Sequence, residues 1–276
     1  MRRLRACLAP SLLLFVSSLL FAGDLPLWSD STGKGGPTIV LLHGAGSDRN
    51  LWDMVLPKLS REHRVVRVEL PGHGASPMLG ELSVKRVAEA VDRALEKEKV
   101  ERAILVGHSY GAWVALEEAV ARPKRAAAVV VVDMGSYTPQ DTARTASLER
   151  YLAERYPQLI RAIFEVLSQS PEESDSAVVQ ALRLPPETMT AYLRDAWRTD
   201  LRERIRNLET PIHVIATESS WPVTQPWERA RNRFGYMTAG PAEGYRIPNT
   251  GHLMMRDRPD TLVTLILDIA KKLPKR

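Results

Sequence analysis

The chain has 276 residues and a formal net charge of +5, and it is 44% hydrophobic and 26% charged. These values are ordinary for a globular protein, and the length allows one large core plus an insertion. Basic residues are interspersed with acidic ones, which excludes the usual nucleic-acid-binding face. The single cysteine, Cys7, excludes an internal disulfide. Without paired-histidine or phosphate-loop motifs, the sequence implies no metal and no cofactor.

The first 23 residues have the pattern of a targeting segment. Three arginines precede an apolar run of about 17 residues at 6–22, and Gly23 follows. This pattern predicts a secretory signal that is removed near Gly23, and hence an exported, periplasmic or secreted protein. Phe21 occupies a position where cleavage favours a small side chain, so an uncleaved membrane anchor is the alternative. Without residues 1–23 the formal charge falls by three, from +5 to +2.

Strand and helix patterns alternate along the rest of the chain. Short apolar runs predict strands, and stretches with helical apolar spacing lie between them. We therefore expect an α/β fold with a mostly parallel sheet of about six strands and helices on both faces. The strands are expected at residues 38–42, 64–69, 103–106, 126–132, 212–216 and 244–247, and the helices at 51–59, 84–95, 112–121 and 262–273.

This alternation stops between residues 135 and 210. No strand pattern is visible there, and prolines separate three helical stretches. Some 75 residues without a strand, between two core strands, predict an inserted helical lid. The predicted organisation is therefore a signal peptide or anchor at 1–23, a core at 24–135, a lid at 136–210 and the rest of the core at 211–276. The helical stretches are expected at 148–167, 176–184 and 187–205.

The segment Gly107-His108-Ser109-Tyr110-Gly111 carries the strongest functional signal. It joins a predicted strand to a predicted helix, and strand, G-x-S-x-G, helix is the arrangement of a nucleophile elbow. The chain reverses sharply there, and glycines flank the apex because side chains would collide where strand and helix approach. The helix N-terminus favours an oxyanion beside Ser109. We predict that Ser109 is a nucleophile; the alternative is a glycine turn with an unreactive serine.

A serine nucleophile needs a base to take its proton and a carboxylate to orient that base. With this elbow the chain order is serine, carboxylate, histidine, and only His213 and His252 follow Ser109. His213 lies within an apolar strand pattern, whereas His252 lies in a loop before the final helix. A catalytic base belongs on a loop at the carboxyl edge of a sheet. We therefore expect His252 to be the base; the alternative is a solvent-facing loop histidine.

A candidate oxyanion hole lies after the first predicted strand, in the segment His43-Gly44-Ala45-Gly46. Small residues there let backbone N–H groups approach a substrate oxygen. We expect the N–H groups of Ala45 and Tyr110 to be the two donors, the alternative being an ordinary glycine turn. A third turn contains His73, which we expect to stabilise its loop rather than to act as a base.

Together, these motifs resemble those of the α/β-hydrolase superfamily, in the group with a helical lid and no cofactor. The resemblance covers residues 36 to 276 and implies the fold far more specifically than the substrate. It departs from the family at the start, because residues 24–36 are too few for the usual first two strands, which we expect to be missing or reduced. The matching segments are His43-Gly44-Ala45-Gly46, Pro71-Gly72-His73-Gly74-Ala75-Ser76, Gly107-His108-Ser109-Tyr110-Gly111 and Thr250-Gly251-His252.

The second departure concerns the acid. The family usually has an aspartate a few residues past the next-to-last strand, but Ser220 stands there and cannot carry the charge. Other members have the acid one core strand earlier, where Asp133 ends the strand at 126–132. That carboxylate would lie beside the elbow strand; its alternative role is to cap a turn. We expect Asp133 to orient His252, and Glu218 remains the alternative acid.

These expectations combine into a serine hydrolase that cleaves an ester or related acyl bond through Ser109, His252 and Asp133. The expected partner is a small-molecule acyl substrate, with no nucleic acid, and with a membrane only if the N-terminal segment is uncleaved. Two alternatives remain: C–C bond or lactone hydrolysis on the same triad, and a non-catalytic ligand receptor with the same pocket. The sequence does not determine the substrate or the oligomeric state.

Overall fold

The computed structural model describes residues 26–139 and 141–274. The predicted signal peptide or anchor, residues 1–23, lies outside the described residues. Among the helices of the described ranges, none has the length and apolar character needed to cross a membrane.

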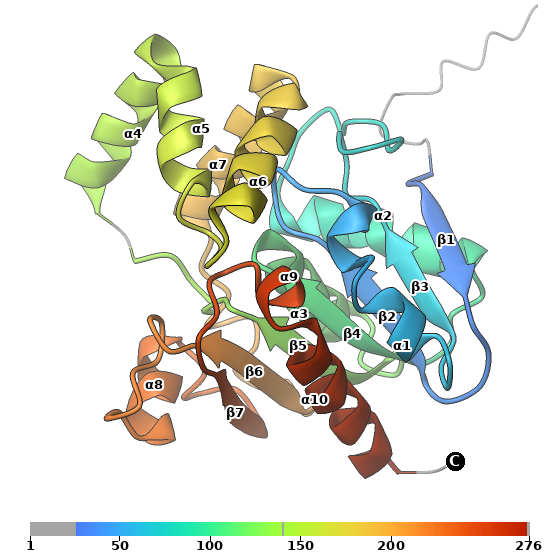
Figure 1. Ribbon diagram of the computed structural model, residues 1–276. Helices are drawn as coiled ribbons and strands as arrows, with labels where there is room; N and C mark the ends of the chain where they lie inside the picture. Colours follow the sequence, from blue (N-terminus) through green and yellow to red (C-terminus); the bar gives the residue numbers. More distant parts are fainter. Residues whose placement is uncertain (1–25, 140, 275–276) are drawn as a thin grey trace, which may run out of the picture.

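One seven-stranded sheet forms the centre of the molecule (Figure 1). Its strand order is β1-β3-β2-β4-β5-β6-β7, and every neighbouring pair is parallel except β1 with β3. The strands are β1 (Ser29–Thr32), β2 (Thr38–Leu42), β3 (Val65–Val68), β4 (Ala103–His108), β5 (Ala126–Val132), β6 (Ile212–Thr217) and β7 (Ala242–Ile247).

The expected α/β fold with a mostly parallel sheet is confirmed, but the sheet has seven strands rather than about six. The additional strand is β1, a four-residue edge strand antiparallel to β3. It has no apolar run, because an edge strand with one solvent-facing side needs none. Arg67 of β3 bonds to Asp30 of β1 through both carboxylate oxygens, so an ion pair replaces apolar packing at this edge.

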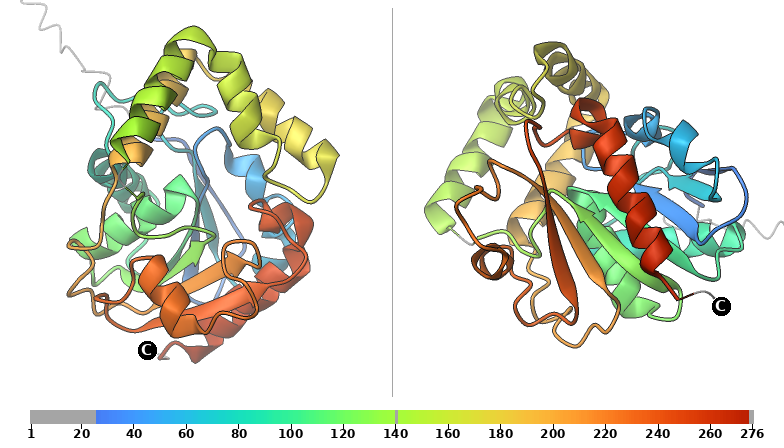
Figure 2. Two further views of the ribbon diagram at one scale, coloured as in Figure 1. Left: turned by 90° about the vertical axis from the view of Figure 1, so that its left-hand side faces the viewer. Right: turned by 60° about the horizontal axis from the view of Figure 1, so that its bottom comes forward.

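Helices cover both faces of the sheet (Figure 2). Alternate residues of β4 face opposite sides, with Leu105 in one apolar cluster and Ile104 in the other, as the two-residue period of a strand requires. One cluster packs against α2 (Val84–Lys97) and α3 (Tyr110–Ala121). The other packs against η2 (Arg49–Trp52), α1 (Leu56–Leu59), α9 (Met254–Asp257) and α10 (Pro259–Lys272). The short helix α8 (Trp227–Arg233) lies beside β7.

The expected helix at 51–59 is wrong as a single element. It is the 3₁₀ turn η2 followed by the one-turn helix α1. Pro57 has no N–H to donate to the carbonyl four residues earlier, so a continuous helix cannot pass through it.

Four helices lie between β5 and β6 and extend over the carboxyl edge of the sheet (Figure 1). The stretch expected as one helix at 148–167 is two, because Pro157 interrupts the hydrogen-bond ladder. The stretch expected at 187–205 ends earlier, where Thr199 takes an extended conformation. The four helices are α4 (Thr142–Glu154), α5 (Tyr156–Phe164), α6 (Pro171–Arg183) and α7 (Pro186–Arg198).

The strand order determines where a site can form. After β2 the chain adds β3 on one side, and it later adds β4 on the other side of β2. The loops that follow β2 and β4 therefore leave the sheet in opposite directions and open a crevice between them. Both loops carry predicted functional residues, and β5, with Asp133 at its end, pairs with β4.

Candidate active site

The turn between β4 and α3 is a sharp reversal with Ser109 at its apex. Ser109 has φ 52° and ψ −122°, a conformation that L-residues rarely adopt. A Cβ on Gly107 would lie 2.2 Å from the carbonyl oxygen of Gly111, and one on Gly111 would lie 2.5 Å from that of His43. Neither position tolerates a side chain, so the two glycines are needed for the strand, the helix and the loop after β2 to approach so closely.

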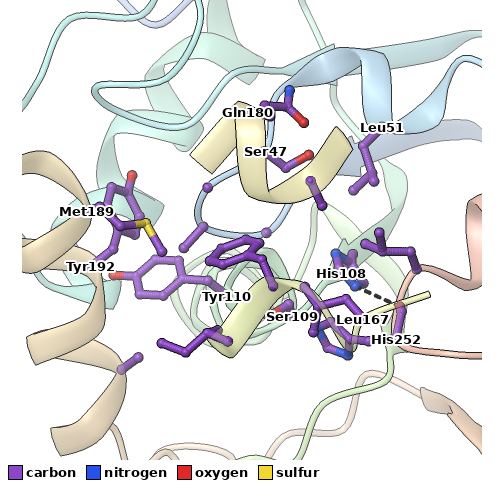
Figure 3. Close-up of a pocket in the computed structure, with 18 of the residues that line it drawn as sticks. Ser47, Leu51, His108, Ser109, Tyr110, Leu167, Gln180, Met189, Tyr192 and His252 are labelled. Atoms are coloured by element: carbon purple, nitrogen blue, oxygen red, sulfur yellow. Dashed lines mark hydrogen bonds between the residues drawn. The ribbon is translucent and has the colours of Figure 1, made fainter. Parts of the chain in front are cut away.

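The structure brings His252 and Asp133 into direct contact. The Nδ1 of His252 lies 2.8 Å from Oδ2 of Asp133. Because an ionised carboxylate only accepts, Nδ1 carries the proton, which leaves Nε2 free to accept one. His252 and Ser109 line the same cavity (Figure 3). The three residues that the sequence singled out therefore converge on one place at the carboxyl edge of the sheet.

Asp133 reaches His252 because β4 and β5 are in parallel register. His108 pairs with Val132, so the residues that follow, Ser109 and Asp133, leave the sheet side by side. The backbone N–H of Ser109 donates to the carbonyl of Val132 at 3.2 Å. Asp133 itself has φ 50°, so the chain turns sharply there too.

Ser220, which stands where an aspartate was expected, contacts this same carboxylate. Its hydroxyl donates to Oδ1 of Asp133 at 2.7 Å, and the backbone N–H of Thr217 donates to the same oxygen at 3.2 Å. Burial by itself would raise the pKa of Asp133, but the hydrogen bonds from His252, Ser220 and Thr217 outweigh it and lower the pKa. The carboxylate is therefore held ionised, with each oxygen occupied by a donor.

Glu218, the alternative acid, is on the neighbouring loop but has a different partner. Its Oε2 accepts from the backbone N–H of Asn249 at 3.5 Å. Asn249 has φ 51°, so this contact lies at the turn that leads into the loop of His252. Among the described residues, Nδ1 of His252 therefore bonds to Asp133, whereas Glu218 bonds to the backbone of the loop that contains His252.

The loop with the expected oxyanion donor is held by two buried histidines. Nε2 of His43 accepts from the N–H of Leu70, and its Nδ1 donates to the carbonyl of Gly44. Nε2 of His73 accepts from the N–H of Gly46 at 3.0 Å, and its Nδ1 donates to the carbonyl of Pro71. Both rings act as one donor and one acceptor, which only the neutral form can do.

Burial lowers the pKa of His43 to about 4 and that of His73 to about 3. The neutral rings thus hold the segment with Ala45 between two fixed neighbours, Gly44 and Gly46. For His73, the geometry agrees with the loop-stabilising role expected from the sequence.

The sequence analysis did not assign a role to His108, which precedes Ser109. Its Nε2 donates to the backbone carbonyl of His252 at 3.0 Å (dashed in Figure 3), and the two ring centroids are 4.4 Å apart. Burial is the main reason that the pKa of His108 lies well below its usual value. His108 therefore ties the loop of His252 to the elbow as a neutral ring. Only its position next to the apex serine could have indicated this.

The cavity around Ser109 has a volume of about 160 Å³. Its walls come from residues 43–47 after β2, which we call the oxyanion loop after its expected donor, and from α3, α5, α6, α7 and the loop of His252. Most of the lining side chains are apolar, and Figure 3 shows Met189 and Tyr192 at one end and Ser47 and Gln180 at another. The apolar lining residues include Leu51, Trp113, Met134, Ile163, Phe164, Leu167, Met189, Leu193 and Leu253.

Helix α7 is tied to the core at two points beside the cavity. The hydroxyl of Tyr110 donates to Asp195 of α7 at 2.6 Å, and the same carboxylate oxygen accepts from the N–H of Val84. The hydroxyl of Tyr192 donates to the carbonyl of Pro71 at 2.8 Å. Tyr192 also packs edge-on against the rings of Tyr110 and His73, with centroids 4.7 Å away in each case. The wall of the cavity is therefore continuous with the oxyanion loop.

Among the described ranges 26–139 and 141–274, no group of three or more His, Cys, Asp or Glu side chains could hold a metal ion.

A model of the alpha/beta hydrolase family matches residues 39–265, which is most of the chain. The chain therefore belongs to the alpha/beta hydrolase family. The resemblance noted from the sequence motifs is confirmed, and the match spans the strands and loops that form the cavity.

Several relatives are named pimeloyl-[acyl-carrier protein] methyl ester esterase. The protein from Yersinia enterocolitica is 24% identical over 277 residues, which cover 89% of this chain and 98% of the relative. The protein from Methylococcus capsulatus is 41% identical over 106 residues, which cover 38% of this chain and 40% of the relative. Together with two relatives named dihydrolipoyllysine-residue acetyltransferase component of acetoin cleaving system, the Methylococcus capsulatus protein is matched over only between 30% and 40% of its own length.

Among solved structures, the enol-lactonase from Burkholderia xenovorans has a similar fold. The TM-score is 0.77 with 18% sequence identity, and the match covers 89% of this chain and 96% of the other. At this level of identity the likeness shows the fold alone.

The two buried histidines predict how stability depends on pH. Their pKa values are lower folded than unfolded, so between pH 4 and 6.5 the unfolded chain binds more protons and stability falls on acidification. Near pH 5 these two protons correspond to about 2.7 kcal/mol per pH unit. Urea denaturation from pH 4.5 to 7.5 measures this slope. In His73→Gln the slope should fall by about half of that figure; an unchanged slope would contradict the assignment.

Proposed function

We propose that the protein is a serine hydrolase of the alpha/beta hydrolase family that cleaves esters of short carboxylic acids. The observation that carries this proposal is the hydrogen bond from His252 to Asp133 beside a cavity that also contains Ser109. The pairing of a neutral imidazole with an ionised carboxylate is what activation of a serine requires. Relatives named as methyl ester esterases support ester cleavage as the class of reaction.

In this mechanism the Oγ of Ser109 attacks the ester carbonyl while Nε2 of His252 takes its proton. The carbonyl oxygen becomes an oxyanion, which accepts hydrogen bonds from the N–H groups of Ala45 and Tyr110. His252 then gives the proton to the alcohol oxygen as the C–O bond breaks, leaving an acyl-enzyme. Water, deprotonated by His252, attacks the acyl-enzyme, and the proton returns to Ser109 as the acid leaves.

Asp133 keeps His252 in the productive tautomer and stabilises the imidazolium that forms. Its lowered pKa supports this role, because it stays ionised when the histidine is protonated. Ser220 and the N–H of Thr217 hold its second oxygen. In this proposal Ser220 is a positioning residue, since it acts through Asp133 and does not contact the substrate.

The cavity limits the size of the substrate. A dry cavity of roughly 150 Å³ holds a molecule about as large as benzene. The cavity of about 160 Å³ therefore accommodates the ester carbonyl with a chain of a few carbon atoms. The mostly apolar walls favour an unsubstituted chain, and the remainder of the substrate would extend through the opening.

We further propose that α4–α7 act as the lid over this site, with α7 as its fixed wall. Hydrogen bonds to Asp195 from Tyr110 and Val84, and one from Tyr192 to the carbonyl of Pro71, tie α7 to the core. Export remains a proposal that rests on the sequence of residues 1–23.

Substitution of two of the proposed catalytic groups, Ser109 and Asp133, tests the function. Ser109→Ala should abolish both hydrolysis of p-nitrophenyl butanoate and labelling by a fluorophosphonate. Asp133→Asn should lower kcat by roughly two to four orders of magnitude, because the imidazole loses its orienting partner. Glu218→Gln is the matched control and should cost far less. Thermal melts must show that each variant is folded. A crippled Glu218→Gln variant with a mild Asp133→Asn effect would reverse the acid assignment.

The role of Ser220 can be separated from a general structural one. Ser220→Ala removes a hydrogen bond to a charged group, so we expect kcat to fall about tenfold with little change in KM. Ser220→Thr, which keeps the hydroxyl, should restore most of the activity. Ser219→Ala is the control, since Ser219 bonds to Thr217 and is exposed. Equal losses in Ser219→Ala and Ser220→Ala would argue against positioning through Asp133.

Chain-length preference tests the size of the cavity. Across p-nitrophenyl esters of two to twelve carbons, kcat/KM should be highest near four to six and at least tenfold lower at twelve. Met189, a buried residue of the cavity wall, limits its length. Met189→Ala should shift the optimum by two or three carbons, because it removes that many methylene-sized groups. A wild-type optimum at twelve carbons would rule out the proposed limit on the length of the acyl chain.

A further inference from the structure

The cavity has a polar rim where it meets the protein surface. Five residues that line the cavity also line an outer depression between the oxyanion loop, α6 and α9, so this is where the two are continuous. Two of the five lie in the loop, Gly46 and Ser47. The other three are polar residues of the helices: Ser176, Gln180 and Arg256. Figure 3 shows Ser47 and Gln180 on one side of the cavity and Met189 on another.

Two side chains of this rim have hydrogen-bonding capacity that the described protein leaves unused. The Oγ of Ser47 is buried and has no hydrogen-bond partner within the described ranges. The carboxamide of Gln180, half-buried on α6, makes no hydrogen bond to another described residue. A buried hydroxyl without a partner is unfavourable, so a ligand group that bonds to it gains free energy on binding.

The charged side chain of the rim, Arg256, already has partners in the protein. Arg256 lies 4.0 Å from Glu173 of α6, and its guanidinium donates to the carbonyl of Asn50. These contacts connect α9 to α6 and to η2 and balance the charge of the arginine. The groups left to recognise a ligand, a hydroxyl and a carboxamide, both donate and accept, so they match a neutral polar group better than an ion.

The position of the base decides which half of an ester meets this rim. His252 must reach the alcohol oxygen to protonate it as it leaves, so the alcohol half lies on its side of the cavity. Arg256 of the rim is four residues beyond His252, on the same short segment. The acyl half then faces the apolar end formed by α7.

The distance to the reaction centre is short. A Cβ on Gly44 would lie 3.0 Å from the Cβ of Ser109, and the N–H of Ser47 bonds to the carbonyl of Gly44 at 3.3 Å. Residues 44–47 thus form a tight turn, which keeps the ends within about 7 Å of each other. A substrate group that bonds to Ser47 therefore belongs only a few bonds from the ester oxygen.

We propose that Ser47 and Gln180 form a polar subsite for the alcohol half of the substrate, which carries an amide or hydroxyl a few bonds from the ester. This rests on the proposed function, since it assigns specificity to the same site. The preferred substrate class is then a short apolar acyl ester of a neutral, hydrogen-bonding alcohol.

The test compares two esters of equal size and shape: 2-acetamidoethyl butanoate and 4-methylpentyl butanoate, which differ only in the amide. The measured quantity is the ratio of their kcat/KM values. In Ser47→Ala and in Gln180→Leu this ratio should fall about tenfold relative to wild type, because the amide loses a hydrogen bond. Gln169→Leu is the matched control, an exposed glutamine outside the cavity lining, and should keep the wild-type ratio.

If the ratio of kcat/KM values is the same in the wild type and in all three variants, the subsite is overturned. Cleavage of both esters would still support the proposed hydrolase function. A wild-type preference for 3-carboxypropyl butanoate over both esters overturns the neutral class of alcohol. Cleavage of no ester also overturns the subsite, and fluorophosphonate labelling then separates the two proposals. If Ser109 is labelled, the proposed hydrolase function is kept. If Ser109 is not labelled, the proposed hydrolase function is rejected as well.

Discussion

The close approach of three backbone segments at the elbow is the constraint on which the rest of the site depends. Gly107 and Gly111 let β4, α3 and the loop after β2 come within contact of one another, and Ser109 takes up the strain with φ 52°. Strain of this kind persists only where the surroundings over-determine it. Here the surroundings are two buried strands and a largely buried helix, so the apex cannot relax without moving the core.

The carboxylate that we propose as the acid, Asp133, has partners from the neighbouring strand and its loop. Strands β5 and β6 are paired in register, so the ends of the two strands present their side chains to the same space. Asp133 follows β5, and the last residue of β6, Thr217, and Ser220 of the loop after it supply the donors that occupy its second oxygen. Uncharged donors lower the pKa of a buried carboxylate without adding a second negative charge to the site.

The wall of the cavity and the oxyanion loop form one packed unit. The rings of His43, His73, Tyr192 and Tyr110 contact each other in sequence, with centroids 4.7 to 5.0 Å apart. The first ring, His43, belongs to the loop after β2, and the last, Tyr110, follows Ser109 at the turn. Asp195 of α7 completes this unit, and burial raises its pKa despite its bonds to Tyr110 and Val84. A change in α7 would therefore alter the packing around Ala45 and Tyr110, which we propose as the oxyanion donors.

The sequence by itself determined six of the strands, the core helices α2, α3 and α10 and the place of the elbow, because apolar periodicity and paired glycines are local signals. It also singled out Ser109, His252 and Asp133, although it left Glu218 open. It missed β1, whose edge pairing depends on Arg67 and Asp30 rather than on an apolar run. Only the tertiary structure decided that Nδ1 of His252 bonds to Asp133, that His108 and Ser220 support this pair, and that Tyr110 holds α7. These contacts join residues 85 to 144 positions apart, and no local pattern in a chain encodes which distant partner a polar side chain will meet.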